Sequence, residues 1–217
     1  MTKRAKPKRV RYDEGCLAAH ALNLIGDRWA LLVVRELMFT PKRFQMIRAG
    51  LPGISASVLT GRLTQLAEIG VVLHDSRLGV YSLSGQGRGL LQVLESLCRW
   101  ALMMPGHDPS RFISPSALMI SMGVNLIQER AMGRSLTAGF DFTDEAFEIR
   151  LDGAALETRF VIPPQAPFVI TGTGNTMAAA VYGARPLPDL VAANMVTVSG
   201  DMEAAQEFLA LFQLAKT

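Results

Sequence analysis

The hydrophobic pattern of this chain changes at residues 105–115, PGHDPSRFISP, where three prolines stiffen a short connection. Before this stretch most apolar residues recur at helical spacing, whereas several later runs alternate apolar and polar residues. We therefore expect two domains, residues 12–104 and 115–217, joined by a linker at 105–114. A basic arm, residues 1–11, precedes the first domain.

Charge is distributed unequally along the chain, although the net charge is only +3. Residues 1–11 contribute +6 without any acid, residues 12–112 contribute +2, and residues 113–217 contribute −5. A basic arm that contains proline and lacks an apolar period is expected to be disordered and to suit a polyanion. The alternative is a solvated tail without a partner. The acidic C-terminal half is not expected to bind nucleic acid.

Composition is that of a globular protein, with 217 residues of which 49% are hydrophobic and 19% charged. Two cysteines and no N-terminal apolar segment argue against a secreted disulfide framework, so a cytoplasmic location is expected. The uncharged stretches 112–128 and 161–184 are interrupted by proline and polar residues. We therefore expect no membrane insertion.

Helical periodicity in the first half predicts helices at residues 16–25 and 28–38, with a third at 42–48 that starts at Thr40 and Pro41. A fourth helix follows with Ser55 as its N-cap. Next come two strands and a last helix. The strands are expected at residues 71–74 and 80–83 around a turn at 75–79, and Ser84 is expected to cap the helix 86–103. This order is that of a winged helix-turn-helix domain.

The fourth helix, within residues 53–66 (GISASVLTGRLTQL), has an apolar face and an opposite face of small polar residues. Such a helix can enter a major groove, where Ser, Thr and Gln reach base edges and phosphates. Cations before the helix and at the hairpin tip suit phosphates. The predicted DNA contacts are Lys42, Arg43, Arg48, Ser55, Ser57, Thr60, Gly61, Arg62, Thr64, Gln65 and Arg77.

Alternative roles exist for several of these large side chains. Arg62 has the alternative of pairing with an acid of its own domain, and Arg77 that of plain exposure to solvent. Trp29 and Trp100 are expected to be core or dimer-interface anchors, since aromatic side chains gain most from burial.

Residues 15–102 resemble the HxlR-type winged-helix regulators. The resemblance rests on the segments Gly26-Asp27-Arg28-Trp29, Leu51-Pro52-Gly53-Ile54-Ser55 and Tyr81-Ser82-Leu83-Ser84. It implies a DNA-binding homodimer that regulates transcription and acts on double-stranded DNA, with the recognition helix within residues 53–66. The chain departs from the family at Ser57, where a basic residue is usual, and at Gly61, where a long polar one is usual.

The second half predicts an α+β domain. Alternating runs at residues 135–141, 147–151, 156–160 and 168–173 predict an antiparallel sheet. Helices are expected to pack on its one buried face, at residues 115–130, 175–182 with Asn175 as the cap, and 202–214.

This half is similar to the sterol carrier protein two-like fold over about residues 115–214. The similarity is carried by residues 168–172 leading into 177–183, and by residues 196–201 ahead of the last helix. It implies a domain that encloses an apolar ligand between sheet and helices. The alternative is an ordinary core without a cavity, and the sequence assigns no ligand-binding residues.

Catalytic and cofactor signals are scarce. His20, His74 and His107 are scattered, so neither a metal site nor a catalytic centre is expected. The glycine-containing turn at 172–177 lacks the third glycine of a dinucleotide-binding motif, and no cofactor is expected. An enzyme is therefore not expected.

Three functions remain. The favoured one is a bacterial transcriptional regulator whose DNA-binding dimer responds to an apolar small molecule or lipid in the C-terminal domain. The second is a lipid carrier that uses the winged helix as a scaffold. The third is a thiol-based redox regulator acting through Cys16, because HxlR-type regulators sometimes sense through an N-terminal cysteine.

Overall fold

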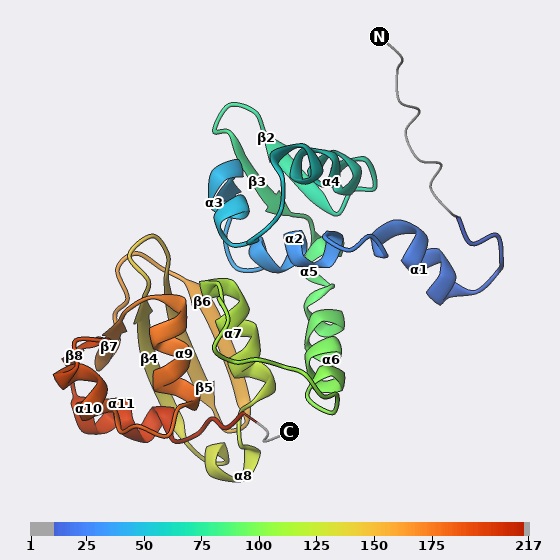
Figure 1. Ribbon diagram of the computed structural model, residues 1–217. Helices are drawn as coiled ribbons and strands as arrows, with labels where there is room; N and C mark the ends of the chain where they lie inside the picture. The colour runs from blue at the N-terminus through green and yellow to red at the C-terminus, as the bar shows by residue number, and fades with distance from the viewer. Residues whose placement is uncertain (1–10, 215–217) are drawn as a thin grey trace.

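The computed structural model describes residues 11–214, which form two domains in series (Figure 1). The predicted basic arm lies outside the described residues except for Arg11, which is exposed. Within residues 11–214, no single helix is long and apolar enough to cross a membrane, although α1 (Leu17–Ile25) and α2 (Ala30–Glu36) pass that test jointly across a 71° bend.

The first domain is a winged helix-turn-helix domain, as expected. After α1 and α2, the elements are β1 (Lys42–Arg43), α3 (Phe44–Ala49), α4 (Ala56–Glu68), β2 (Val72–Asp75), β3 (Val80–Leu83), α5 (Gly85–Arg88) and α6 (Leu91–Ala101). The helix pair α3 and α4 forms the helix-turn-helix, and the hairpin of β2 and β3 forms the wing. The apolar face of α4 is buried in the core, as its spacing predicts, through Leu59, Leu63 and Leu66.

Caps and turns of the winged helix are as the sequence predicts. Ser55 accepts a hydrogen bond from the Val58 amide at 3.3 Å and begins α4. Just before it, Gly53 has a φ of +86°, a conformation that favours glycine. Ser84 accepts from the Gly87 amide at 3.1 Å and begins α5.

Two element predictions in this domain are wrong. Lys42 and Arg43 form a strand rather than the start of a helix, because their backbone pairs with Tyr81 and Val80 of β3. The helix predicted at residues 86–103 is divided into α5 and α6 at Gly89 and Leu90. Glycine stabilises a helix poorly, and nearby Gly87 must lack a side chain because its backbone lies against the Val71 carbonyl.

The second domain is an α+β domain built on a five-stranded sheet in the order β6-β5-β4-β7-β8. Its elements are α7 (Pro115–Val124), α8 (Gln128–Ala131), β4 (Ser135–Asp141), β5 (Ala146–Asp152), β6 (Ala155–Phe160), β7 (Phe168–Thr171), α9 (Gly174–Tyr182), α10 (Leu187–Ala192), β8 (Thr197–Gly200) and α11 (Met202–Leu209). The prediction of an antiparallel sheet is wrong in one place, since β4 and β7 are parallel. The segment 161–167 carries the chain past β5 to the far side of β4, where β7 runs in the same direction as β4.

Helix ends in this domain also differ from the predictions. The first helix ends at Val124 and the last at Leu209, and α10 was not predicted. Thr173, rather than Asn175, caps α9. The Asn175 side chain instead holds the linker, donating to the Arg111 carbonyl at 2.9 Å and accepting from the Ile113 amide at 3.3 Å.

Helices α7, α9 and α11 lie over one face of the sheet (Figure 1). Fully buried Phe140, Met177 and Phe208 fill the space between this face and the helices. The side chains are therefore packed where the sterol carrier resemblance implies an enclosed ligand.

The two domains share a packed interface in addition to the linker. Helix α7 of the second domain packs against α6 and α2 of the first. Its Ile120 side chain belongs to the hydrophobic core of the first domain. Phe39, which follows α2, contacts the cores of both domains. The first domain therefore packs directly against α7.

Candidate nucleic-acid interface

Helix α4 lies on the side of the first domain away from the second (Figure 1). Its exposed residues include the small Ser55, Ser57, Thr60, Gly61 and Thr64, together with Ala56, Val58, Ala67 and Glu68. The Thr60 hydroxyl donates to the Ala56 carbonyl at 2.9 Å, a bond along the helix that leaves the side chain at its surface. A Cβ at Gly61 would meet no atom within 4 Å, so the backbone there is open to close approach.

Three arginines provide exposed positive charge around this helix. Arg43 is the N-cap of α3, Arg48 lies in the last turn of α3, and Arg77 lies in the wing turn. None of the three guanidinium groups makes a hydrogen bond or ion pair with residues 11–214. These charges are available to an anionic partner.

Arg62 and Gln65 do not belong to this exposed face. Arg62 forms an ion pair with Asp27 and donates to the Gln65 side-chain oxygen. Gln65 in turn donates to the Leu24 carbonyl at 2.8 Å. Both side chains therefore have partners within their own domain, and for Arg62 the alternative, an acid of its own domain, is the arrangement observed, while their DNA contacts stay predictions.

Lys42 was predicted to contact DNA, and this prediction is wrong because its side chain is fully buried. Successive residues of a strand point to opposite faces, so Arg43 is exposed while Lys42 points inward. The Lys42 ammonium donates to Glu145 Oε1 at 2.6 Å and to Ser116 Oγ at 3.1 Å, both in the second domain. It also lies 3.5 Å from Glu36 Oε2.

A cavity of about 280 Å³ lies between α4 and the wing, and sequence reasoning missed two of its residues. Thr60 and Thr64 line it from α4, while His74 and Tyr81 line it from β2 and β3. His74 and Tyr81 are cross-strand partners whose rings stack at 4.3 Å. Residues directly opposite each other in an antiparallel hairpin lie on the same face of it, which is why His74 and Tyr81 come together.

Family comparisons support the assignment of the first domain. A family model described as HxlR-like helix-turn-helix matches residues 24–108. YvaP of Bacillus subtilis, an uncharacterized HTH-type transcriptional regulator, is 36% identical over 87 residues, which are 37% of this chain and 80% of that protein. The chain belongs to the HxlR-like helix-turn-helix family.

Other HxlR-like relatives are also transcriptional regulators by name. YodB of Bacillus subtilis is 35% identical over 86 residues, or 37% of this chain and 77% of YodB. Rv3095 of Mycobacterium tuberculosis is 35% identical over 92 residues, or 40% of this chain and 58% of the relative. The solved structure of quinone-bound YodB is 32% identical and covers 41% of this chain and 98% of its own, with a TM-score of 0.38.

A second family model, described as alkyl sulfatase C-terminal, matches residues 107–217, slightly more than half of the chain. The HxlR-like domain is therefore followed by a domain of the alkyl sulfatase C-terminal family. The similarity of this half to the sterol carrier protein two-like fold stays a prediction.

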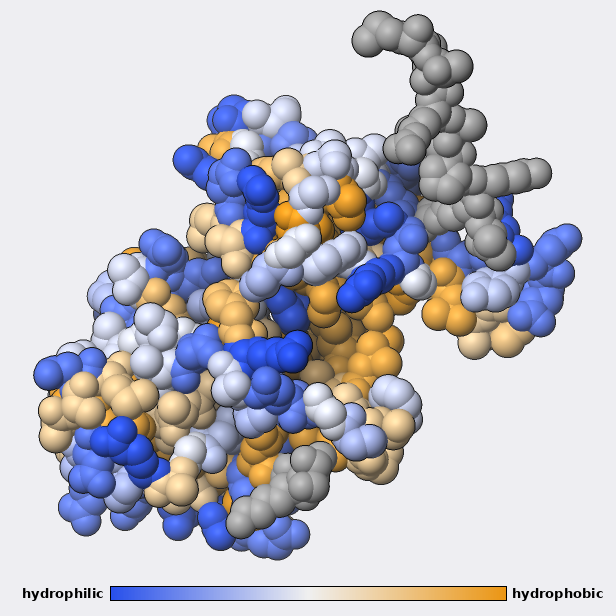
Figure 2. Space-filling view, viewed as in Figure 1, coloured by the Kyte–Doolittle hydropathy of each residue, from blue (hydrophilic) through white to orange (hydrophobic). Residues whose placement is uncertain are grey.

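Helix α6 of the HxlR-like domain carries an exposed apolar stripe (Figure 2). Val93, Leu97 and Trp100 follow one another at spacings of four and three residues, so they share one side of the helix, and exposed Met104 follows just after the helix ends. Trp100 is 56% exposed, although tryptophan gains much from burial. Helix α1 protrudes from the rest of the domain (Figure 1), and its Leu17 side chain is 84% exposed.

The two cysteines of the HxlR-like domain lie in different environments. Cys16 is exposed at the N-cap of α1, where the nearby backbone amides of Ala19 and Ala18 lower its pKa. Burial raises the pKa of Cys98 on α6, and the nearby Arg35 charge opposes that shift only in part. The thiolate therefore forms more readily at Cys16.

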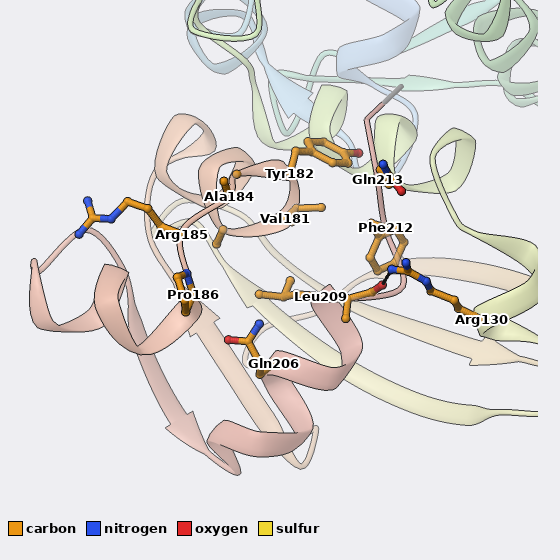
Figure 3. A pocket seen from close by; sticks show the side chains of 13 residues that line it. Arg130, Val181, Tyr182, Ala184, Arg185, Pro186, Gln206, Leu209, Phe212 and Gln213 are labelled. Atoms are coloured by element: carbon orange, nitrogen blue, oxygen red, sulfur yellow. Dashed lines mark hydrogen bonds between the residues drawn. The ribbon is translucent and has the colours of Figure 1, made fainter. Parts of the chain in front are cut away.

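A surface pocket of about 320 Å³ lies in the second domain, at the end of α9 and beside α11 (Figure 3). Its wall combines apolar side chains such as Leu209 and Phe212 with polar Gln206. Arg130 also borders it and donates to the Ala210 carbonyl at 2.7 Å. This pocket is at the edge of the domain rather than between sheet and helices.

Proposed function

We propose that this protein regulates transcription by binding operator DNA as a homodimer, with α4 as the recognition helix. The observation that carries the proposal is the exposed small polar face of α4 beside three unpaired arginine side chains in the described chain. Family membership supports it, because the HxlR-like relatives are named as transcriptional regulators.

Base and phosphate contacts divide between two groups of residues in this proposal. Ser57, Thr60 and Thr64 lie on the helix face and read base edges in the major groove. Arg43, Arg48 and Arg77 neutralise phosphates, which sets affinity and register rather than sequence preference. Gly61 lets the helix backbone approach the groove closely.

The apolar stripe on α6 is the proposed dimer contact. Pairing two copies of the stripe about a two-fold axis removes Trp100 and Leu97 from water in both copies. A dimer of this kind places two recognition helices in successive major grooves, so the operator is expected to have half-sites about one helical turn apart.

Selection of duplexes from a random DNA library tests DNA binding directly. We expect Arg43→Ala/Arg48→Ala/Arg77→Ala to bind the selected duplex more weakly and to show a shallower dependence of log affinity on log salt, by about 0.9 for each phosphate that an arginine no longer neutralises. Arg159→Ala, which removes an exposed arginine of the second domain, is the matched control. Unchanged affinity of the triple variant would exclude the assigned face.

For the second domain, we propose modulation of DNA binding by a small molecule that has an apolar part. The surface pocket supports this through its mixed wall of Leu209, Phe212 and Gln206. Native mass spectrometry of the purified protein tests for a retained ligand, and Leu209→Trp is designed to occupy the pocket. A carrier of enclosed lipid is less well supported, because Phe140 and Phe208 fill the interior.

Redox regulation through Cys16 is a second candidate, favoured by the exposure of this thiol and its lowered pKa. Solved structures of relatives include quinone-bound YodB and an oxidized form of the redox regulator HypR. Treating the protein with diamide and measuring DNA affinity tests this candidate. A response that persists in Cys16→Ser would exclude Cys16 as the sensor.

A further inference from the structure

A largely buried polar cluster lies between the two domains, formed by Arg35, Glu36, Lys42, Ser114, Ser116 and Glu145 and here named the Lys42 cluster. Arg35, Glu36 and Lys42 belong to the HxlR-like domain. Ser114 and Ser116 lie at the start of α7, and Glu145 lies between β4 and β5. Within the HxlR-like domain Glu36 pairs with Arg35 and Lys42, and across the domain boundary Lys42 pairs with Glu145.

Hydrogen bonds cross the domain boundary in both directions: Ser114 donates to Glu36, and Lys42 donates to Glu145. Glu36 Oε1 accepts from Arg35 at 2.7 Å and from the Ser114 hydroxyl at 2.6 Å. The Lys42 ammonium, fully buried, has Glu145 Oε1 at 2.6 Å as its shortest contact. A buried cation needs such a partner, because its desolvation is costly. Separating the domains would leave Lys42 without its shortest contact.

The Lys42 cluster also holds both ends of α3, the first helix of the helix-turn-helix. Lys42 lies in β1, immediately before α3. At the other end, Arg35 donates to the Gly50 carbonyl at 3.0 Å. A side chain at Gly50 would collide with the Glu36 carboxylate, so this end of α3 lies directly against the cluster.

The DNA-binding arginines are attached to this same segment. Arg43 follows Lys42 in β1, and Arg48 lies in the last turn of α3. A displacement of Lys42 therefore moves β1 and α3 together with both arginines and the turn that leads into α4.

We propose that Glu145 of the second domain is a positioning residue for the DNA-binding face, acting through Lys42 and the two ends of α3. The proposal rests on the proposed DNA-binding function and names the contact through which the second domain regulates it. Among the described residues, Glu145 Oε2 is buried without a hydrogen-bond partner, and burial raises the pKa of this carboxyl. One oxygen of the Glu145 carboxylate is therefore bonded to Lys42 and the other is not bonded. Such a carboxylate suits a position that a bound molecule can change.

Replacing Glu145 by Gln tests the proposal in the full-length protein. Glu145→Gln is expected to weaken binding to the duplex selected by the wild-type protein by about 5- to 150-fold, the usual range for coupled sites. Affinity for a random duplex of the same length and its salt dependence should stay unchanged, because no exposed cation is removed. A loss of folded protein alone would lower the active fraction without changing the ratio of the two affinities.

Two further variants make the test specific. Ser116→Ala removes the 3.1 Å hydrogen bond to Lys42 without changing charge, and should lower the same ratio by a smaller factor. Glu157→Gln removes a carboxylate that pairs with Arg159 at 2.9 Å on the surface of the same domain, and should change nothing. The proposal is overturned if both Glu145→Gln and Ser116→Ala keep the wild-type ratio.

Amide hydrogen exchange separates this proposal from the proposed function. In Glu145→Gln the amides of β1 and α3 should exchange faster, while those of α9 keep their wild-type rates. If the wild-type protein selects no duplex, the DNA-binding function fails and exchange alone decides the coupling. Unchanged exchange in β1 and α3 would then overturn it.

Discussion

Lys42→Met is expected to destabilise the protein strongly, because the Lys42 side chain is fully buried and paired with Glu145. Methionine keeps most of the volume of the side chain but removes the ammonium group. Glu145 Oε1 is then left without its partner at 2.6 Å, while Oε2 already lacks one in the described chain. Glu36 is less affected, because Arg35 and Ser114 still bond to it.

Removing one partner of a buried ion pair costs about 3–5 kcal/mol, since the other charge stays buried without compensation. This is a large part of the total stability of a domain, about 5–15 kcal/mol. For a chain of this size each kcal/mol lowers the melting temperature by about 2–4 °C, so a decrease of roughly 6–20 °C is expected. Circular dichroism during heating and in urea measures both quantities.

A double variant and a surface control complete this experiment. Lys42→Met/Glu145→Leu removes both charges and should recover much of the loss, because an apolar pair of similar volume needs no ionic partner. Arg159→Met breaks an exposed pair of comparable length, Arg159 to Glu157 at 2.9 Å, and should cost less than about 1 kcal/mol. The reasoning is refuted if Lys42→Met destabilises the protein no more than Arg159→Met does.

Three further predictions concern pH, assembly and thiol reactivity. Because burial raises the pKa of Glu145 in the folded protein, the folded state binds this proton more tightly than the unfolded chain does. The stability contributed by this group is therefore present below the unfolded-state pKa and is lost as pH rises through the folded-state pKa, a slope that urea titrations should find reduced in Glu145→Gln. Trp100→Asp, which puts a charge into the apolar stripe of α6, should shift the protein to monomer in light scattering, whereas Arg77→Asp should not. Iodoacetamide should modify Cys16 faster than Cys98 at neutral pH, and equal rates would contradict the assigned environments.

Local chemistry was enough to predict most elements of both domains. The Ser55 cap depends only on residues within one helical turn, and the buried face of α4 follows from the spacing of Leu59, Leu63 and Leu66. Strand β4 has the predicted bounds of residues 135–141, because its alternating pattern is set by adjacent residues. The winged helix could therefore be predicted from the order of such signals along the chain.

Tertiary structure alone decided which cations are exposed. Lys42 and Arg43 are adjacent and look equally suited to DNA, yet pairing of β1 with β3 turns Lys42 inward and leaves Arg43 at the surface. The partner that neutralises Lys42, Glu145, lies 103 residues further along the chain. Arg62 likewise meets Asp27 across 35 residues. A local pattern contains no information on such distant partners, because burial of a charge depends on which opposite charge the folded chain brings beside it.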